Sequence, residues 1–466
     1  MKRHLTKVFF CAGARNHPLL KEFEEEEVLF EVDERIASFK ALGLTKVKGP
    51  VGICTTSGTA VSECLSAMLE AYYSGAPLVL ITGDRPKKMH GTGAPQTIDH
   101  EIITRGARRS FHEVTLEEFQ TMDLRNLEYP AHINVLIDDT KDNDFKAIHQ
   151  NDLGSFKIFL KDKKKPLFIL SHSEKSLRPV AEELSKRKLS FYSESLSGAR
   201  DLSFIKTEKK LIELFKGGFF DSVIRIGHTP LSKVWRLIET APLPVYHFDS
   251  RGLSGMSFGE VLKITPEEMM SNTLFLEALD SLLPYPVADE TPWKLSELNI
   301  KYPDSEIAYF QKLNDLLPSG SSVYLGNSLV IRFFELTQSK NFDVYGNRGV
   351  NGIDGQLATA IGLSQGLENQ LYVILGDVTA LYDLTSMKDL PKNVTLIIMN
   401  NRGGRIFDML GLDKRIVMEH EFSFEKIAKA FGLTYSNSFD DLNFANVIEL
   451  FPNKESSAEA LKEWMK

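Results

Sequence analysis

Two polar side chains in the last third of the chain have the types and placement of ligands for a divalent cation. Asp377 comes shortly after the apolar run Leu371–Leu375, and Asn401 comes shortly after the apolar run Val394–Met399. If both runs are strands of one parallel sheet, the two side chains lie at its ligand-binding edge. Mg²⁺ prefers a few such oxygen ligands together with phosphate oxygens and water. Either residue alone would indicate only a turn. Together they favour a site for Mg²⁺ shared with a phosphate group.

A carboxylate in the first third of the chain also follows a predicted strand, as Asp377 and Asn401 do. Glu34 follows the apolar run Val28–Val32 and opens a predicted helix, Glu34–Val47. In isolation, an acid in a first helical turn complements the helix dipole and needs no further role. The next predicted strand, Val51–Thr55, also ends in a turn into a helix. Two neighbouring strand ends of this kind could line one crevice.

Arginine and amide side chains collect on loops of the same type, after other predicted strands. Planar guanidinium groups suit the bidentate capture of carboxylates. Each arginine by itself is more often part of a surface ion pair. The set that we single out comprises Arg15, Arg85, Gln96, Ser328, Arg332 and Arg348.

The composition excludes several classes of function. The chain has 466 residues, 42% of them hydrophobic, and a net charge of −8, which argues against a nucleic-acid-binding protein with a broad basic face. No apolar run reaches the ~18 residues of a membrane-spanning helix, and the apolar stretch near the N-terminus is too short for a signal peptide. Cys11, Cys54 and Cys64 fit no metal motif and predict reduced thiols in a cytoplasmic protein.

Strands and helices alternate along the whole chain, which is typical of parallel α/β layers. The polar stretches Asp138–Asp144 and Lys161–Lys165 predict a linker near 145–165, and a proline cluster at 284–292 predicts a second one. We therefore expect three α/β domains, at 1–150, 165–285 and 295–466. A helix is expected at Thr59–Tyr73. The expected strands are Val8–Cys11, Val28–Val32, Val51–Thr55, Pro77–Thr82, His132–Asp138, Leu167–Ser171, Leu189–Tyr192, Ser222–Gly227, Val245–Asp249, Ser322–Leu325, Leu371–Leu375, Val394–Met399 and Val447–Leu450.

Short sequences around the candidate residues resemble a known family. Gly376-Asp377 with Asn400-Asn401 resembles the cofactor motif of thiamine-diphosphate enzymes. Longer matches are similar to the 2-succinyl-5-enolpyruvyl-6-hydroxy-3-cyclohexene-1-carboxylate synthases of menaquinone biosynthesis. In the first and last thirds of the chain these matches follow the family's motifs in the same order and at similar spacing. The middle third resembles the family only in its general character. These matches are Asp33-Glu34-Arg35, Thr56-Ser57-Gly58-Thr59-Ala60, Asp84-Arg85-Pro86, Gly93-Ala94-Pro95-Gln96-Thr97-Ile98, Gly326-Asn327-Ser328, Asn347-Arg348-Gly349, Asn351-Gly352-Ile353-Asp354-Gly355 and Asn401-Arg402-Gly403-Gly404-Arg405-Ile406-Phe407.

The resemblance implies a thiamine-diphosphate-binding fold of three domains with parallel sheets flanked by helices. The domain at 1–150 would bind the pyrimidine ring, and the domain at 295–466 would bind the diphosphate and the metal. It also implies a homodimer or homotetramer with active sites at the subunit interface.

The resemblance also implies residue roles. Glu34 would activate thiamine diphosphate by hydrogen-bonding its aminopyrimidine ring, and Ile353 would keep the cofactor bent. Asp377, Asn401 and the Gly403 carbonyl would hold Mg²⁺ or Mn²⁺. The further cofactor contacts would be Thr56, Gly376, Thr379 and Phe407, and the substrate contacts would be Arg15, Arg85, Gln96, Ser328, Arg332 and Arg348.

The implied reaction is decarboxylation of 2-oxoglutarate and addition of the resulting carbanion to isochorismate. Three positions depart from the family pattern: Ala14 lacks a hydroxyl, Pro95 replaces an asparagine, and Arg402 stands where a third asparagine is common. An acetolactate-synthase-like enzyme that accepts pyruvate is one alternative, although such an enzyme would not need several arginines in its site. Other thiamine-diphosphate lyases or decarboxylases belong to the same alternative. A non-catalytic cofactor-binding or regulatory homologue is a further one, and a metal-dependent phosphatase or an unrelated α/β enzyme is the last.

Overall fold

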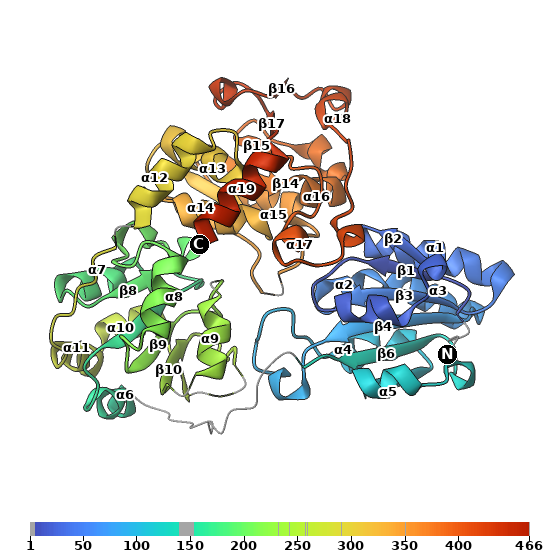
Figure 1. The fold of residues 1–466 in the computed structure, drawn as a ribbon, viewed down its shortest axis with the longest axis horizontal. Helices are drawn as coiled ribbons and strands as arrows, with labels where there is room; N and C mark the ends of the chain where they lie inside the picture. The colour runs from blue at the N-terminus through green and yellow to red at the C-terminus, as the bar shows by residue number, and fades with distance from the viewer. Residues whose placement is uncertain are drawn as a thin grey trace. The chain divides into compact units, whose positions relative to one another are not determined.

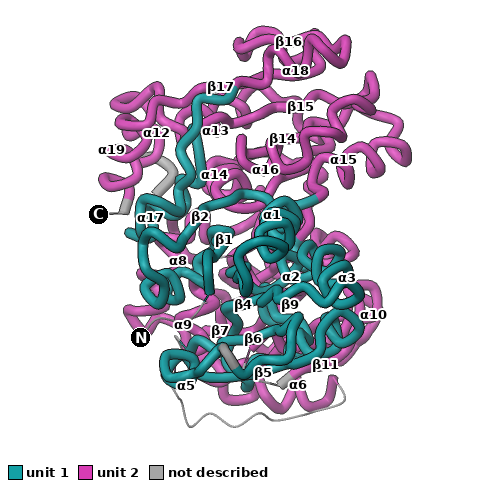
Figure 2. The backbone as a smooth tube through the Cα atoms, turned by 90° about the vertical axis from the view of Figure 1, so that its right-hand side faces the viewer, with its two compact units in different colours: residues 1–139, 348–354, 402–422 teal, residues 140–347, 355–401, 423–466 magenta. Residues whose placement is uncertain are grey.

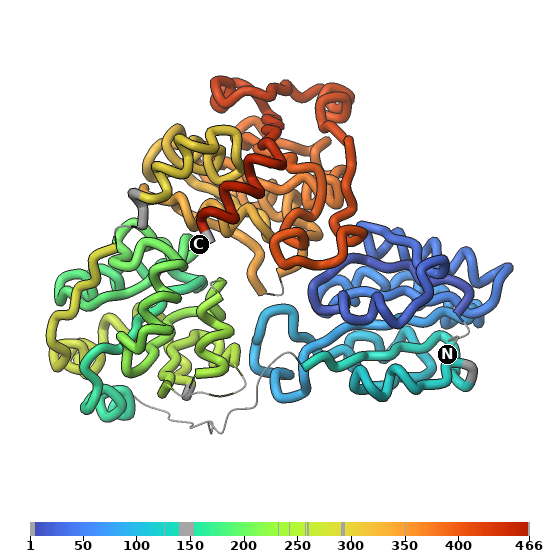
Figure 3. Tube along the Cα trace, viewed as in Figure 1, coloured from blue at the N-terminus to red at the C-terminus, as the bar shows by residue number. Residues whose placement is uncertain are grey.

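A computed structural model describes residues 5–138, 153–231, 233–241, 243–256, 258, 260–289, 291–349 and 351–465. Within these ranges the chain forms three sheets in which every strand pairing is parallel, and helices flank each sheet (Figure 1). The predicted α/β fold is thereby confirmed. Figure 3 follows the chain through the sheets in sequence order. No helix in the described ranges has both the length and the apolarity needed to cross a membrane.

The first sheet has the strand order β2-β1-β3-β4-β6-β5. Its central strands are buried on both faces, which explains their continuous apolar sequences, such as the run Leu78–Ile81 within β4. The strands are β1 (Val8–Cys11), β2 (Val28–Glu31), β3 (Val51–Thr56), β4 (Leu78–Asp84), β5 (Ser110–Thr115) and β6 (Ala131–Leu136), and the helices are α1 (Glu34–Lys48), α2 (Thr59–Glu63), α3 (Leu65–Ser74), α4 (His100–Thr104) and α5 (Leu116–Thr121).

The second sheet has the order β11-β10-β9-β7-β8. Its strands are β7 (Pro166–Leu170), β8 (Phe191–Ser193), β9 (Ser222–Ile226), β10 (Val245–Asp249) and β11 (Glu260–Lys263), and its helices are α6 (Leu153–Leu160), α7 (Arg178–Lys186), α8 (Glu208–Lys216), α9 (Val234–Thr240), α10 (Pro266–Ser271) and α11 (Thr273–Asp280).

The third sheet has the order β13-β12-β14-β15-β17-β16. Its strands are β12 (Ser322–Leu325), β13 (Asp343–Tyr345), β14 (Leu371–Gly376), β15 (Val394–Met399), β16 (Tyr435–Ser436) and β17 (Val447–Leu450), and the helices in this part of the chain are α12 (Thr291–Lys301), α13 (Glu306–Leu316), α14 (Leu329–Thr337), α15 (Gln356–Ser364), α16 (Asp377–Tyr382), α17 (Ile406–Met409), α18 (Glu425–Ala430) and α19 (Lys454–Met465).

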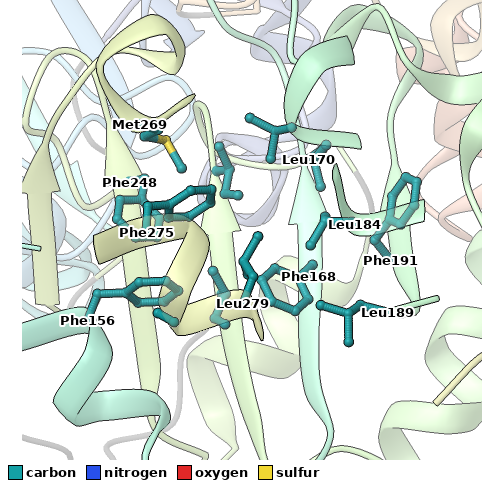
Figure 4. Packing of buried hydrophobic residues seen from close by; sticks show 14 of the residues in the cluster. Phe156, Phe168, Leu170, Leu184, Leu189, Phe191, Phe248, Met269, Phe275 and Leu279 are labelled. Carbon is teal, nitrogen blue, oxygen red and sulfur yellow. The ribbon is translucent and has the colours of Figure 1, made fainter. Parts of the chain in front are cut away.

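An aromatic cluster fills one face of the second sheet (Figure 4). Phe156 of α6 stacks on Phe275 of α11, with ring centroids 5.6 Å apart. It also meets Phe248 of β10 edge to face at 4.8 Å. The Phe156 side chain therefore connects α6 to both α11 and β10.

The chain divides into two compact units (Figure 2). Unit 1 comprises Met1–Asp139, Arg348–Asp354 and Arg402–Phe422, and unit 2 comprises the remaining residues. The first sheet thus lies in unit 1, and the other two lie in unit 2. The predicted linker within 145–165 lies partly outside the described residues, as does the domain limit at 150, so the predicted domain limits stay predictions.

Two details differ from the sequence-based expectations. The edge strands β5, β11, β13 and β16 were not expected. The expected helix Thr59–Tyr73 is two helices, because the backbone N–H of Cys64 bonds to the Val61 carbonyl three residues back. That tighter turn separates α2 from α3.

Candidate active site

Glu34 is the first residue of α1, immediately beyond the sheet strand β2. The preceding residue, Asp33, caps the helix by accepting a hydrogen bond from the Ile36 backbone N–H at 2.9 Å. The hydroxyl of Thr55, at the end of β3, donates to Glu34 Oε1 at 3.3 Å. The cap and this hydrogen bond hold the half-buried Glu34 carboxylate at the edge where both strands end.

Buried thiols lie near Glu34. Burial is the main cause that raises the pKa of the Cys11 and Cys64 thiols, and the negative charge of Glu34 raises both further. The Cys64 thiol also points to the Glu34 carbonyl at 3.9 Å. One wall around Glu34 is therefore made of uncharged, buried thiols.

Two hydroxyls at the end of β3 are candidates for hydrogen bonds to a bound ligand. Thr56 Oγ1 and Ser57 Oγ are buried, and neither has a hydrogen-bond partner among the described residues. A buried hydroxyl without a partner is costly. Polar groups of a cofactor at this strand end would satisfy both.

The first sheet also brings together the loops that carry Arg15 and Arg85. A Cβ atom at Gly83 would lie 2.7 Å from the Asn16 Cα, so only glycine allows these two strand ends to approach. The Arg15 guanidinium donates to the Ile137 carbonyl at 3.3 Å. Both arginines are buried.

Arg85 and Gln96 lie on one loop. Arg85 Nε donates to the Pro95 carbonyl at 2.8 Å. The next residue, Gln96, has a φ of +60°, an uncommon conformation for a residue other than glycine. Pro95, one of the departures from the family pattern, thus supplies the carbonyl that orients Arg85.

The segment with Arg348 and Ile353 belongs to unit 1, as Glu34 does. Thr59 Oγ1 donates to Asp354 Oδ1 at 2.6 Å and so holds the segment at the start of α2. A Cβ atom at Gly352 would lie 2.2 Å from Asp354 Oδ1 and 2.3 Å from Thr59 Oγ1, so a larger residue would displace the two side chains that make this hydrogen bond. Arg348 and Ile353 are half-buried. Val350 lies outside the described residues.

Asp377 stands where the sequence predicts it, at the carboxyl end of β14. Strands β14 and β15 pair in parallel with Gly376 opposite Met399, so Asp377 and Asn400 come next on neighbouring strands. Asp377 Oδ1 accepts a hydrogen bond from the Val378 backbone N–H at 2.8 Å. Asp377 and Thr379 are buried at the start of α16.

The two asparagines after β15 have different partners. Asn400 Nδ2 donates to the buried Glu449 at 2.6 Å, which fixes that side chain within unit 2. Asn401 Nδ2 donates to Glu306 Oε2 at 3.0 Å. Since the amide nitrogen faces Glu306, the amide oxygen of Asn401 faces the other way, as a metal ligand requires. Glu306 is not among the residues predicted from the sequence, because no local motif marks it.

Gly403 and Phe407 fall in unit 1, whereas Asp377 and Asn401 fall in unit 2. The Gly403 carbonyl accepts a hydrogen bond from the Arg405 backbone N–H at 2.9 Å. Phe407 packs against the hydrophobic core of the first sheet. The role of the Gly403 carbonyl as a metal ligand therefore stays a prediction.

Ser328 and Arg332 lie at the start of α14 in unit 2. Ser328 has a φ of +70°, and the Arg332 guanidinium donates to its carbonyl oxygen. Burial lowers the pKa of Arg332, while the nearby charge of Glu208 acts in the opposite direction. A half-buried guanidinium of this kind is suited to pairing with a substrate carboxylate.

The donor set at the end of β14 and β15 fits a magnesium diphosphate. A buried carboxylate and an oriented amide oxygen are hard ligands on adjacent strand ends, and phosphate oxygens and water complete such sites. In unit 1, Glu34 and the two buried hydroxyls of Thr56 and Ser57 are suited to the polar edge of a heteroaromatic ring.

Residues 1–103 match the family described as thiamine pyrophosphate enzyme, N-terminal TPP binding domain. This match and the parallel sheets with polar strand ends define the chain as a thiamine-diphosphate-dependent enzyme.

Curated relatives narrow the assignment. A 2-succinyl-5-enolpyruvyl-6-hydroxy-3-cyclohexene-1-carboxylate synthase from Bdellovibrio bacteriovorus is 34% identical over 97% of this chain and 94% of its own. Relatives with the same name are 30% identical in Akkermansia muciniphila, over 96% of this chain and 93% of theirs, and 27% identical in Bacillus pumilus, over 94% and 88%. The chain belongs to this family of synthases, as the sequence motifs predicted, and not to the acetolactate synthases.

Proposed function

We propose that the protein decarboxylates 2-oxoglutarate and adds the resulting carbanion to isochorismate. The product is 2-succinyl-5-enolpyruvyl-6-hydroxy-3-cyclohexene-1-carboxylate, an intermediate of menaquinone biosynthesis. The observation that carries the proposal is the family membership, at 34% identity over 97% of the chain. The presence of Glu34, Asp377 and Asn401 at the ends of parallel strands supports it.

Asp377 and Asn401 would hold Mg²⁺ or Mn²⁺ against the cofactor diphosphate, with the Gly403 carbonyl as a third ligand. Gly376 and Thr379 would contact the diphosphate, since they flank Asp377. Glu306 supports this role for Asn401 by holding its amide nitrogen. When bound, thiamine diphosphate supplies a nucleophilic carbon and an electron sink for decarboxylation.

Glu34 would hold a proton between its carboxylate and the aminopyrimidine ring of the cofactor. The Thr55 hydroxyl supports this role, because it orients the Glu34 carboxylate by hydrogen-bonding Oε1. Thr56, Ile353 and Phe407 would make the remaining cofactor contacts.

The substrate carboxylates require cations. Arg15, Arg85, Arg332 and Arg348 would supply them, with Gln96 and Ser328 as polar partners. The burial of Arg15 and Arg85 favours this role, because a buried guanidinium gains more from a carboxylate than an exposed one does.

The enzyme would work in the cytoplasm as a homodimer or homotetramer with active sites at the subunit interface. Exposed apolar side chains on α1, the helix that begins at Glu34, support self-association: Ile36 is 41% exposed and Phe39 is 45% exposed.

The test is release of CO₂ from 2-oxoglutarate by the purified protein with thiamine diphosphate and Mg²⁺, with and without isochorismate. We expect release that depends on isochorismate, with both substrates consumed in equal amounts. Pyruvate should not replace 2-oxoglutarate. Turnover of pyruvate would instead support the acetolactate-synthase-like alternative, and cofactor binding without any release would support a non-catalytic homologue.

A further inference from the structure

A buried polar network lies directly behind the loop that carries Arg85 and Gln96. Its centre is Asp84, the last residue of β4, whose side chain is fully buried. Asn134 of β6 donates from Nδ2 to Asp84 Oδ2 at 3.1 Å, and the Arg85 backbone N–H donates to Asp84 Oδ1 at 2.7 Å. Asp84 therefore connects the sheet to the first residue of the loop.

His90 closes this network from the loop side. Its Nε2 lies 3.0 Å from Asp84 Oδ2 and 3.2 Å from the carbonyl oxygen of Arg85. The imidazole thus contacts both the carboxylate at the end of β4 and the backbone of the arginine that follows. It remains 26% exposed, so it can exchange protons with solvent.

The deep end of the network is uncharged. His132 lies between two hydroxyls, Thr82 Oγ1 and Thr104 Oγ1, each 2.9 Å from one ring nitrogen. Burial lowers the pKa of His132 well below its ordinary value and lowers the pKa of His100 as well. Both rings are therefore neutral near pH 7, and the negative charge of Asp84 faces His90.

The groups around His90 favour its protonated form. Asp84 from β4 raises the pKa of His90 first, through their hydrogen bond, and Glu113 from β5 adds to the effect. Partial burial acts against it, and the neighbouring ring of His100, from α4, is uncharged. Glu113 is paired with Lys87 at 2.9 Å. Burial acts to raise the pKa of Asp84, but its hydrogen bonds with His90, Asn134 and the Arg85 backbone N–H outweigh that effect, so the pKa falls.

We propose that protonated His90 is a positioning residue that fastens the loop 85–96 to Asp84 and thereby presents Arg85 and Gln96 to a substrate carboxylate. The inference rests on the proposed function for the roles of Arg85 and Gln96. Arg85 Nε is held by the Pro95 carbonyl, so the two ends of the loop are linked through this side chain. Anchoring His90 therefore restrains the loop between Arg85 and Gln96.

The sign of the pH dependence follows from the direction of the shift. The pKa of His90 is raised in the folded protein, so the anchor is complete below the ordinary histidine value of about 6.5 and is lost as the pH rises through the raised value. We expect the KM for the carboxylate substrates to rise over that interval, while kcat and the Kd for thiamine diphosphate change little.

His90→Leu and His90→Gln test the proposal. His90→Leu should raise KM about tenfold at pH 6, since a hydrogen bond to a charged group is lost, and should leave the calorimetric Kd for thiamine diphosphate unchanged. His90→Gln retains a donor, so KM should rise less and should no longer depend on pH in this interval. Lys87→Gln removes a charge from the same loop at a residue that does not contact Asp84, and should leave KM at pH 6 at the wild-type value.

Two further readouts do not depend on turnover. The His90 resonance, assigned as the signal missing from His90→Gln, should titrate above pH 6.5 in NMR spectra. Amide hydrogen exchange in residues 85–97 should accelerate in His90→Leu. A protein with these two properties but no synthase activity would contradict the proposed function alone. If amide exchange in His90→Leu matched that of the wild type, or if its KM were unchanged at every pH, the proposed anchoring role of His90 would be wrong.

Discussion

Asp33 fixes where α1 begins and therefore where the Glu34 carboxylate lies. Thr55 then holds one carboxylate oxygen at 3.3 Å. We expect Glu34→Gln to lower kcat about 10²- to 10⁴-fold, because the amide cannot share a proton with the cofactor ring. Steady-state CO₂ release measures this effect.

The Glu34→Gln variant should still bind thiamine diphosphate with Mg²⁺, since Glu34 contacts neither the diphosphate nor the metal in the proposed site. Isothermal titration of the cofactor is the control. Unchanged turnover in the variant would contradict the role assigned to Glu34.

Glu306 orients the proposed metal ligand Asn401 from a distant part of the chain. We expect Glu306→Ala to weaken Mg²⁺ affinity about 10- to 100-fold, the usual effect of losing a group that orients a metal ligand. Glu306→Gln keeps an oxygen that accepts the Asn401 N–H and should restore most of the affinity. Titration of Mg²⁺ in saturating thiamine diphosphate distinguishes the variants, and equal affinities in all three proteins would contradict the orientation.

Arg332 has a guanidinium whose pKa is lowered by burial. We expect Arg332→Ala to raise the KM for 2-oxoglutarate at least about tenfold, because a charged hydrogen-bonded pair is lost. The Kd for thiamine diphosphate should stay near the wild-type value. If neither KM nor kcat for 2-oxoglutarate changes, Arg332 does not hold that carboxylate.

The sequence identifies residues that follow strands more readily than residues that support them. Asp377 and Asn401 can be found because each comes directly after an apolar strand. Glu306 cannot, since its contact with Asn401 spans 95 positions and begins on a helix with no motif. The hydrogen bond between Asn400 and Glu449 cannot be predicted from the sequence either. Only the structure shows that the two neighbouring asparagines have different partners.

At the scale of elements, the strands that sequence reasoning missed share one property. The strands β5, β11, β13 and β16 all lie at sheet edges. β5, for example, is only partly buried along its length. Without burial on both faces a strand needs no continuous apolar run, which is the signal that marks the central strands.

The second sheet offers a test of packing at this scale. Phe156 of α6 is fully buried, whereas Ile158 of the same helix is 73% exposed. We expect Phe156→Ala to destabilise this sheet by about 3–5 kcal/mol, since a large cavity opens between α6 and α11. Calorimetry should show a lower unfolding midpoint, and Ile158→Ala should leave the midpoint nearly unchanged. Equal midpoints in both variants would mean that the cluster can close around the cavity.

At the scale of the whole molecule, the face of α1 predicts self-association. A shallow hollow of about 390 Å³ is lined by Arg35, Ile36, Phe39 and Lys40. We expect Phe39→Asp to weaken the proposed dimer at least about tenfold, because an exposed apolar side chain that the partner subunit would bury becomes a charge. Sedimentation equilibrium measures the association. Val47→Asp, at the far end of the same helix, is the control, and a monomeric wild-type protein would contradict the proposed assembly.

The composition of unit 1 has a consequence for how the protein is made. Its residues come from Met1–Asp139, Arg348–Asp354 and Arg402–Phe422. The ribosome therefore synthesises the first sheet before the second, but the last piece of the same unit emerges only after the whole second sheet has been made. Until then the nascent chain displays an incomplete surface to chaperones and proteases. A premature stop codon shortly before residue 402 would accordingly harm the unit that holds the first sheet, far upstream of the stop.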